Sequence, residues 1–81
     1  MIELYQFEQC PYSRKVREKL TELHLDWVAR SAPKGSPQRQ KLIELGGKDQ
    51  VPFLYDPEKG IKLYESDAII AYLEKEYGNT A

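Results

Sequence analysis

The stretch MIELYQFEQCPYSRKVREKLTEL, residues 1–23, decides the fold because its hydrophobic pattern changes period part of the way along. Residues 1–7 carry apolar and aromatic side chains on both faces, as a central strand of a sheet does. Pro11 suits the first turn of a helix, where its missing N–H costs nothing. Apolar side chains then recur at the spacing of one helix face, at Tyr12, Val16, Leu20 and Leu23. We therefore expect a strand over residues 1–7 and a helix over 11–23.

Strand and helix signals alternate along the rest of the chain. They predict a strand at 25–30, a helix capped by Ser36 with Pro37 in its first turn and ended by Gly46 and Gly47, a hairpin of strands at 51–55 and 61–64 around a turn at 56–60, and a last helix with Ser66 as N-cap and Gly78 at its end. The first strand–helix–strand unit favours parallel strands joined by a right-handed crossover. The order βαβαββα predicts an α/β protein with a four-stranded mixed sheet and helices on both faces, the thioredoxin fold.

Composition limits the classes of function. With 81 residues the chain suits one domain, and we expect a single domain over residues 1–81. A net charge of -1 offers no electrostatic footprint for a nucleic acid. No apolar run is long enough for a membrane helix and residues 1–5 lack a signal-peptide pattern, so we expect a cytoplasmic protein that binds no membrane. The single cysteine, Cys10, excludes an intramolecular disulfide and a Cys-rich metal site.

Cys10 lies where the first expected strand gives way to the first expected helix. Free N–H groups and the positive end of the helix dipole stabilise a thiolate at such a position. Arg14, Lys15 and Arg17 add positive charge nearby, and Ser13 can donate a hydrogen bond to the sulfur. The alternative is a buried structural cysteine. The position at a helix start favours a reactive thiol.

Three motifs resemble known glutathione-binding proteins. Cys10-Pro11-Tyr12-Ser13 resembles the active-site motif of glutaredoxins, with serine in place of the second cysteine. Val51-Pro52 resembles the cis-proline signature of glutathione-binding thioredoxin folds. Glu65-Ser66-Asp67-Ala68-Ile69 is similar to a segment of the glutathione S-transferase N-terminal domain. The motifs occur in the order of these families and cover essentially the whole chain, so the resemblance implies that glutathione is the ligand.

The resemblance also implies roles for the residues around Pro52. A cis bond there would turn the backbone N–H and C=O of Val51 towards the cysteinyl main chain of glutathione, which would pair like an added strand. A trans proline at the start of an edge strand is the alternative. Gln50, rather than Lys48, is the better match for a side chain that reaches the glycine carboxylate of the ligand.

The other end of glutathione is expected at the last helix. The resemblance places the carboxylate of Glu65 on the ammonium of the γ-glutamyl group, with Asp67 nearby. Ser66 and the N-terminus of the helix would meet the γ-glutamyl carboxylate. Tyr12 either packs beside the ligand or anchors its own helix as part of the apolar stripe. The catalytic group implied by the resemblance is Cys10 with Pro11, Tyr12 and Ser13.

The function implied by the resemblance is that of a monothiol glutaredoxin-like thiol–disulfide oxidoreductase. Cys10 would reduce mixed disulfides of glutathione with other thiols, and we expect a monomer. Many glutaredoxins carry a lysine where this chain has Phe7, and Glu8 adds a negative charge, so the degree of activation of Cys10 stays open.

Two alternatives use the same motifs. In one, two copies would share a [2Fe–2S] cluster between Cys10 and glutathione, although Pro11 replaces the glycine of the cluster-carrying class. In the other, the chain is a transferase-derived domain that binds glutathione with little catalysis. Transferases add a helical second domain, and the sequence ends at Ala81, so we expect no conjugating activity.

Other distinctive residues have structural interpretations. His24 is expected to be a surface or capping residue at the end of the first helix. Trp27, Tyr64, Tyr72 and Tyr77 are interpreted as packing residues.

Overall fold

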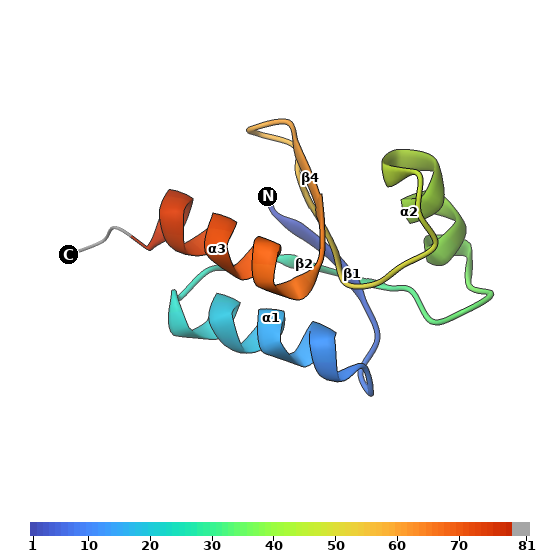
Figure 1. Ribbon diagram of the computed structural model, residues 1–81, viewed down its shortest axis with the longest axis horizontal. Coiled ribbons are helices and arrows are strands. Elements are labelled where there is room, and N and C mark those ends of the chain that lie inside the picture. The colour runs from blue at the N-terminus through green and yellow to red at the C-terminus, as the bar shows by residue number, and fades with distance from the viewer. Residues whose placement is uncertain (79–81) are drawn as a thin grey trace.

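The structure, a computed structural model, describes residues 1–78 and has the element order expected from the sequence (Figure 1). Residues 79–81, the end of the expected single domain, lie outside the described residues. The elements are β1 (Glu3–Gln6), α1 (Pro11–Glu22), β2 (Val28–Ser31), α2 (Pro37–Gly46), β3 (Phe53–Asp56), β4 (Ile61–Tyr64) and α3 (Ser66–Tyr77). Within residues 1–78, none of the helices has the length and apolar character that a membrane span requires.

The four strands form one mixed sheet in the order β2-β1-β3-β4. β1 pairs parallel with β2 and antiparallel with β3, and β3 pairs antiparallel with β4. β1 is therefore an inner strand, and its Leu4 and Tyr5 are both fully buried although they point to opposite faces. The apolar character of both faces of this strand, seen in the sequence, is confirmed.

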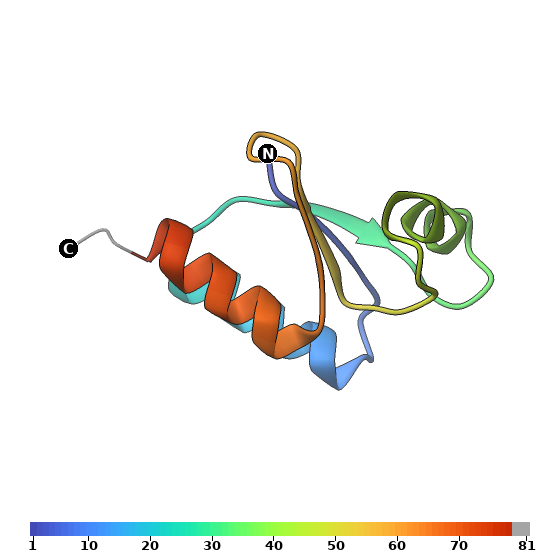
Figure 2. The same ribbon diagram turned by 45° about the horizontal axis from the view of Figure 1, so that its top comes forward.

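Each face of the sheet has its own hydrophobic core. α1 and α3 lie side by side on one face, and α2 lies alone on the other (Figure 2). The core under α1 and α3 contains Ile2, Leu4, Val16, Leu20, Leu54, Ile69 and Leu73. The core under α2 is smaller and contains Tyr5, Ala32, Leu42 and Phe53. The thioredoxin fold with helices on both faces is confirmed.

The strand boundaries differ from the expected ones. β1, β2 and β3 each begin two or three residues later than the sequence pattern predicted. Leu25 and Trp27 lie before β2 and still pack against the core, because a hydrophobic pattern reports burial rather than backbone pairing. The expected packing role of Trp27 is confirmed.

The first two helices begin as expected, α2 ends as expected, and α1 ends one residue earlier than expected, at Glu22. Pro11 and Pro37 occupy the first turns of α1 and α2. The Ser36 hydroxyl caps α2 by accepting a hydrogen bond from the Arg39 N–H at 3.2 Å. Gly47 ends α2 with φ 92°, a left-handed conformation that favours glycine.

The expected N-cap of α3 is wrong by one residue. Glu65 is the N-cap, and its carbonyl accepts the first bond of the helix, from the N–H of Ile69 at 2.9 Å. Ser66 is already the first helical residue. Because Glu65 has φ 74°, the chain turns abruptly at that residue and enters the helix immediately after it. A serine is usually a cap, so the sequence pattern favoured the wrong one of two adjacent residues.

A polar cluster closes the end of the sheet where β3 runs into the turn. The carboxylate of Asp56, which is 1% exposed, accepts hydrogen bonds from the hydroxyls of Tyr72, at 2.7 Å, and of Tyr77. Burial and the bond to Asp56 raise the pKa of Tyr77 to about 12. Both tyrosines therefore hydrogen-bond a buried carboxylate, in addition to the packing expected of them.

Candidate functional site

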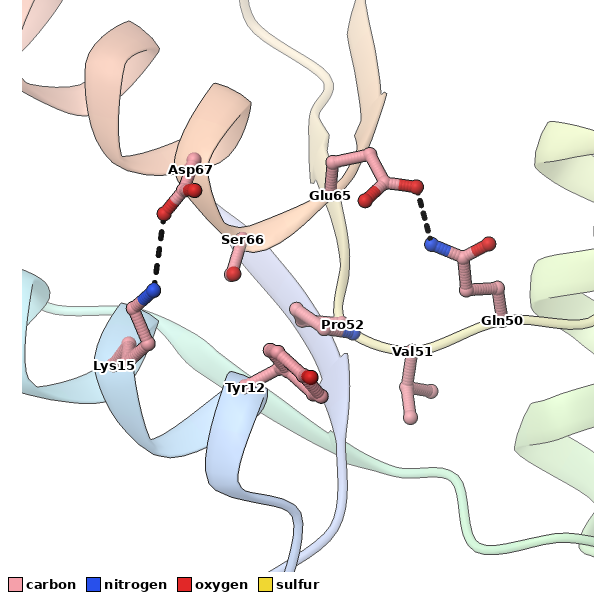
Figure 3. A pocket seen from close by; sticks show the side chains of 8 residues that line it. All are labelled: Tyr12, Lys15, Gln50, Val51, Pro52, Glu65, Ser66 and Asp67. Atoms are coloured by element: carbon pink, nitrogen blue, oxygen red, sulfur yellow. Dashed lines mark hydrogen bonds and ion pairs between the residues drawn. The ribbon is translucent and has the colours of Figure 1, made fainter.

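A cavity of about 380 Å³ opens at the end of the sheet opposite Asp56. Three segments meet there: the first turns of α1, the chain entering β3, and the chain that links β4 to α3 (Figure 3). They meet because Tyr5 pairs with Phe53 and Phe53 pairs with Tyr64, which aligns the ends of three strands. The cavity is lined by Tyr12, Lys15, Gln50, Val51, Pro52, Glu65, Ser66 and Asp67.

The cavity brings together all the side chains that the sequence analysis assigned to the ligand. Tyr12 is 61% exposed and forms part of the cavity wall, so the interpretation of Tyr12 as an anchor of its helix is wrong. Lys48 points elsewhere, with its ammonium 5.5 Å from the centre of the Tyr64 ring. The preference for Gln50 over Lys48 agrees with this placement.

Lys15 is a cavity residue whose position the sequence analysis did not identify. From the sequence, Lys15 is expected only to add positive charge near Cys10. It lies three residues after Tyr12, and residues three apart share one face of a helix. This spacing could have placed Lys15 beside Tyr12 in the wall. Its ammonium pairs with the Asp67 carboxylate at 3.0 Å (Figure 3).

A second polar contact crosses the cavity from the β3 side. The Gln50 amide donates to the Glu65 carboxylate, with 2.9 Å between Nε2 and Oε2 (Figure 3). The resemblance assigned Gln50 and Glu65 to opposite ends of glutathione, but their side chains here contact each other. Contacts between exposed polar groups contribute only about 0–1 kcal/mol, so a charged ligand can replace them.

Cys10 lies next to the cavity without lining it. It is the N-cap of α1, is 6% exposed, and its Sγ accepts a hydrogen bond from the backbone N–H of Ser13 at 3.4 Å. The hydrogen bond expected from Ser13 therefore comes from its main chain. The Ser13 hydroxyl is buried and has no hydrogen-bond partner among the described residues. Pro11 and Ser13 shape the helix start rather than the cavity wall.

Arg17 fixes the loop that leads to Cys10. Its guanidinium donates to Gln6 Oε1 at 2.6 Å, to the Phe7 carbonyl at 3.3 Å and to the Glu8 carbonyl at 3.1 Å. The Cys10 N–H in turn donates to the Phe7 carbonyl at 3.2 Å. The positive charge of Arg17 is therefore directed at loop carbonyls, and its structural effect is to fix the position of the thiol.

Two backbone features occur at the cavity. The peptide bond between Val51 and Pro52 is cis, as the resemblance implied. Glu65 has φ 74°, a region that non-glycine residues rarely adopt and that costs about 1–3 kcal/mol. Such strain is concentrated at functional sites, where it aims a side chain or a peptide group.

The element order, the sheet topology and the position of the cavity define a thioredoxin-fold domain with a candidate ligand site at the start of α1 and α3. Residues 4–81 match the family model described as glutathione S-transferase, N-terminal domain. The glutathione S-transferase-like protein OpS6 of Beauveria bassiana (strain ARSEF 2860) is 33% identical over 76 residues, which cover 94% of this chain and 35% of that protein. The chain belongs to the glutathione S-transferase N-terminal domain family.

Solved structures of glutathione transferases have the same fold. A delta-class glutathione transferase of Nilaparvata lugens superposes with a TM-score of 0.83 at 29% identity, over 95% of this chain and 36% of that one. A glutathione transferase homologue of Drosophila mojavensis, solved with bound glutathione, has a TM-score of 0.84 at 25% identity, over 96% of this chain and 36% of that one. The chain thus spans little more than a third of the length of the relatives it matches.

Proposed function

We propose that this domain binds glutathione in the cavity and that Cys10 reduces glutathione mixed disulfides. The observation that carries the proposal is the convergence of Tyr12, Gln50, Val51–Pro52, Glu65 and Ser66 on one cavity from three separate segments. Family membership and a structural relative solved with bound glutathione support the choice of ligand.

The charges of the cavity suit the γ-glutamyl end of glutathione. Glu65 is exposed and its partner in the cavity is a neutral amide, so an ammonium group would replace Gln50 with a stronger, charge-assisted bond. The N-terminus of α3 offers N–H groups and the positive end of its dipole to the γ-glutamyl carboxylate of the ligand. Lys15 neutralises the charge of Asp67. It thereby reduces the repulsion between Asp67 and the γ-glutamyl carboxylate of the ligand.

The rest of the ligand would lie along the chain entering β3. The main chain of Val51 would pair with the cysteinyl main chain of glutathione in the manner of an added strand. Tyr12 would cover the ligand from the α1 side. The ligand sulfur would then approach the start of α1, where Cys10 receives the N–H of Ser13.

The proposed reaction needs one protein thiol. The Cys10 thiolate attacks the glutathione sulfur of a mixed disulfide GS–SR and forms a Cys10–glutathione disulfide. The S–S bond to R breaks, and RS⁻ leaves with its electron pair and takes a proton from water. A second glutathione thiolate attacks the glutathione sulfur of the intermediate, which releases oxidised glutathione and restores the Cys10 thiolate.

A second candidate is conjugation of glutathione to an electrophile, which the family favours. The burial of Cys10 is the observation behind it, because a sulfur that is 6% exposed has limited access to a protein disulfide. In that case the start of α1 would stabilise the thiolate of bound glutathione, and Cys10 would not form a covalent intermediate.

The two candidates separate in one set of assays on the purified chain. We expect wild type to reduce the mixed disulfide of glutathione and cysteine, and Cys10→Ser to lose turnover while still binding glutathione in calorimetry. Ser13→Ala is the matched control, because its backbone N–H remains and much of the turnover should persist. Full turnover in Cys10→Ser would overturn the oxidoreductase proposal. Conjugation of 1-chloro-2,4-dinitrobenzene without disulfide reduction would establish the second candidate.

A further inference from the structure

Tyr64 connects the two sides of the cavity without lining it. It is the last residue of β4 and directly precedes Glu65. Its hydroxyl accepts a hydrogen bond from the Lys48 N–H at 3.0 Å and donates to the Lys48 carbonyl at 2.9 Å. One side chain therefore satisfies both backbone groups of a residue that lies two positions before Gln50.

The approach of Tyr64 to this segment depends on Gly46. A Cβ at residue 46 would lie 2.7 Å from the Cε2 and Cζ atoms of the Tyr64 ring, which is too close for real atoms. The centre of the same ring lies 4.6 Å from that of Phe53. The ring is thus confined between the last residue of α2 and the core, and it has little freedom to shift.

A second contact fixes the same segment from α2. Arg39 is 7% exposed, and its guanidinium donates to the Ala32 carbonyl at 2.9 Å and to the Asp49 carboxylate at 2.8 Å. Asp49 is the residue immediately before Gln50. Residues 48 and 49 are therefore held by side chains of β4 and α2, and neither side chain belongs to the cavity wall.

We propose that Tyr64 is a positioning residue that sets the separation between Gln50 and Glu65 and thereby the affinity of the cavity for glutathione. The inference rests on the proposed function, because it needs glutathione to be the ligand. Gln50 follows the segment that the Tyr64 hydroxyl holds, and Glu65 directly follows Tyr64 in the chain. The hydroxyl therefore fixes the position of Gln50 relative to Glu65. Loss of the hydroxyl leaves the Lys48 N–H and carbonyl to water and lets residues 48–50 move away from Glu65.

The thiol is held independently of Tyr64. Cys10 lies on the α1 side, where Arg17 fixes its loop and the Ser13 N–H contacts its sulfur. Loss of the Tyr64 hydroxyl should therefore change the binding of glutathione and leave the rate of the chemical step unchanged. A change in binding without a change in the rate of the chemical step distinguishes a positioning role from a merely structural one.

The test compares Tyr64→Phe with Tyr72→Phe in the full chain. Both variants remove one tyrosine hydroxyl that makes a hydrogen bond, and Tyr72 lies at the Asp56 end of the sheet. We expect Tyr64→Phe to raise the Kd for glutathione, and the KM for the mixed disulfide, about tenfold, with kcat within about twofold of wild type. Tyr72→Phe should leave all three values unchanged although it lowers stability.

A double-mutant cycle with Gln50→Ala tests whether Tyr64→Phe changes the Kd by displacing Gln50. If Tyr64 acts by placing Gln50, the effect of Tyr64→Phe on Kd should shrink to about twofold when Gln50 is absent. Gly46→Ala keeps the hydroxyl but displaces the ring, and we expect it to weaken glutathione binding in the same direction. This variant provides the test if Tyr64→Phe does not fold.

The outcomes distinguish the inference from the proposed function. Wild type that fails to bind glutathione refutes the proposed function and, with it, this inference. Wild type that binds, together with Tyr64→Phe or a folded Gly46→Ala that binds equally well, refutes the inference alone. A lower kcat at unchanged Kd would also refute it. Full additivity in the cycle would refute the route through Gln50.

Discussion

Asp56 and Glu65 are carboxylates near opposite ends of the β3–β4 hairpin, and the fold treats them in opposite ways. Asp56 is buried and accepts hydrogen bonds from two tyrosine hydroxyls of α3. Burial by itself would raise the pKa of Asp56, but the bonds from Tyr77 and Tyr72 outweigh it and leave that pKa below its usual value. Glu65 is exposed and accepts a hydrogen bond from the neutral amide of Gln50.

The difference indicates which end of the domain suits a charged ligand. A buried carboxylate with donors from its own fold is saturated, and its contribution is to stability. An exposed carboxylate on a strained backbone, with a weak and replaceable partner, can accept a cation from outside. The charge of the two groups is the same, and their surroundings favour a structural role for Asp56 and the proposed ligand contact for Glu65.

Removal of the buried carboxylate should have the largest effect. We expect Asp56→Ala to lower the free energy of unfolding by about 2–6 kcal/mol, because each of two tyrosine hydroxyls loses its acceptor at about 1–3 kcal/mol. Urea unfolding followed by circular dichroism measures this loss. Asp26→Ala is the control, since Asp26 is exposed at the same end of the molecule and should change stability by less than about 0.5 kcal/mol.

The assignment of Asp56 to structure also predicts unchanged binding. Asp56→Ala should bind glutathione with the wild-type Kd wherever it is folded. A large loss of glutathione affinity in folded Asp56→Ala would contradict a purely structural role for Asp56.

Removal of the exposed charge should have a smaller effect, and on binding rather than on stability. We expect Glu65→Gln to weaken glutathione binding about 10- to 100-fold, because a charge-assisted bond to the ligand ammonium becomes a neutral one. The free energy of unfolding should change by less than about 0.5 kcal/mol. Calorimetry and urea unfolding give the two numbers, with Glu58→Gln, another exposed glutamate, as the control. Wild-type affinity in Glu65→Gln would show that this carboxylate does not meet the ligand.

The smallest expected effect is a pH dependence of the free energy of unfolding, which arises from Asp56. Because the folded-state pKa of Asp56 lies below its unfolded value, the stabilisation is fully present above the unfolded pKa, at about pH 4, and is lost as the pH falls through the folded pKa. The difference in unfolding free energy between wild type and Asp56→Ala should therefore narrow as the pH falls below about 4. Urea unfolding from neutral pH to pH 2 measures it. A constant difference over this range would contradict the cause given for the lowered pKa.

Much of the fold could be predicted from the sequence because it depends on periodic patterns. The apolar spacing from Val16 to Leu20 identified the first helix, and the apolar residues on both faces of residues 1–7 identified an inner strand. The residues of the cavity were implied by the family resemblance of three motifs, each lying at a point where one element gives way to the next. The parallel pairing of β1 with β2 and the hairpin of β3 and β4 bring those points to one end of the sheet.

The parts that were missed depend on single contacts between distant residues. The sequence predicts Gly46 and Gly47 together as the end of α2, and Gly47 is its left-handed cap, but it does not show that Gly46 also makes room for the ring of Tyr64. The contact of Gln50 with Glu65 joins residues 15 positions apart, and the cap lies at Glu65 rather than Ser66 because Glu65 adopts φ 74°. No periodicity in the sequence reports such contacts.

The unequal sizes of the two cores predict which part of the domain unfolds first. α2 covers the smaller cluster alone, whereas α1 and α3 share the larger one. Segments with fewer buried contacts open at lower free energy, so the amide protons of α2 should exchange with solvent before those of α1. Arg39, which holds Asp49 beside the cavity, would be released at that stage, while the loop before Cys10 stayed in place. We therefore expect warming to weaken the proposed binding of glutathione before it displaces Cys10.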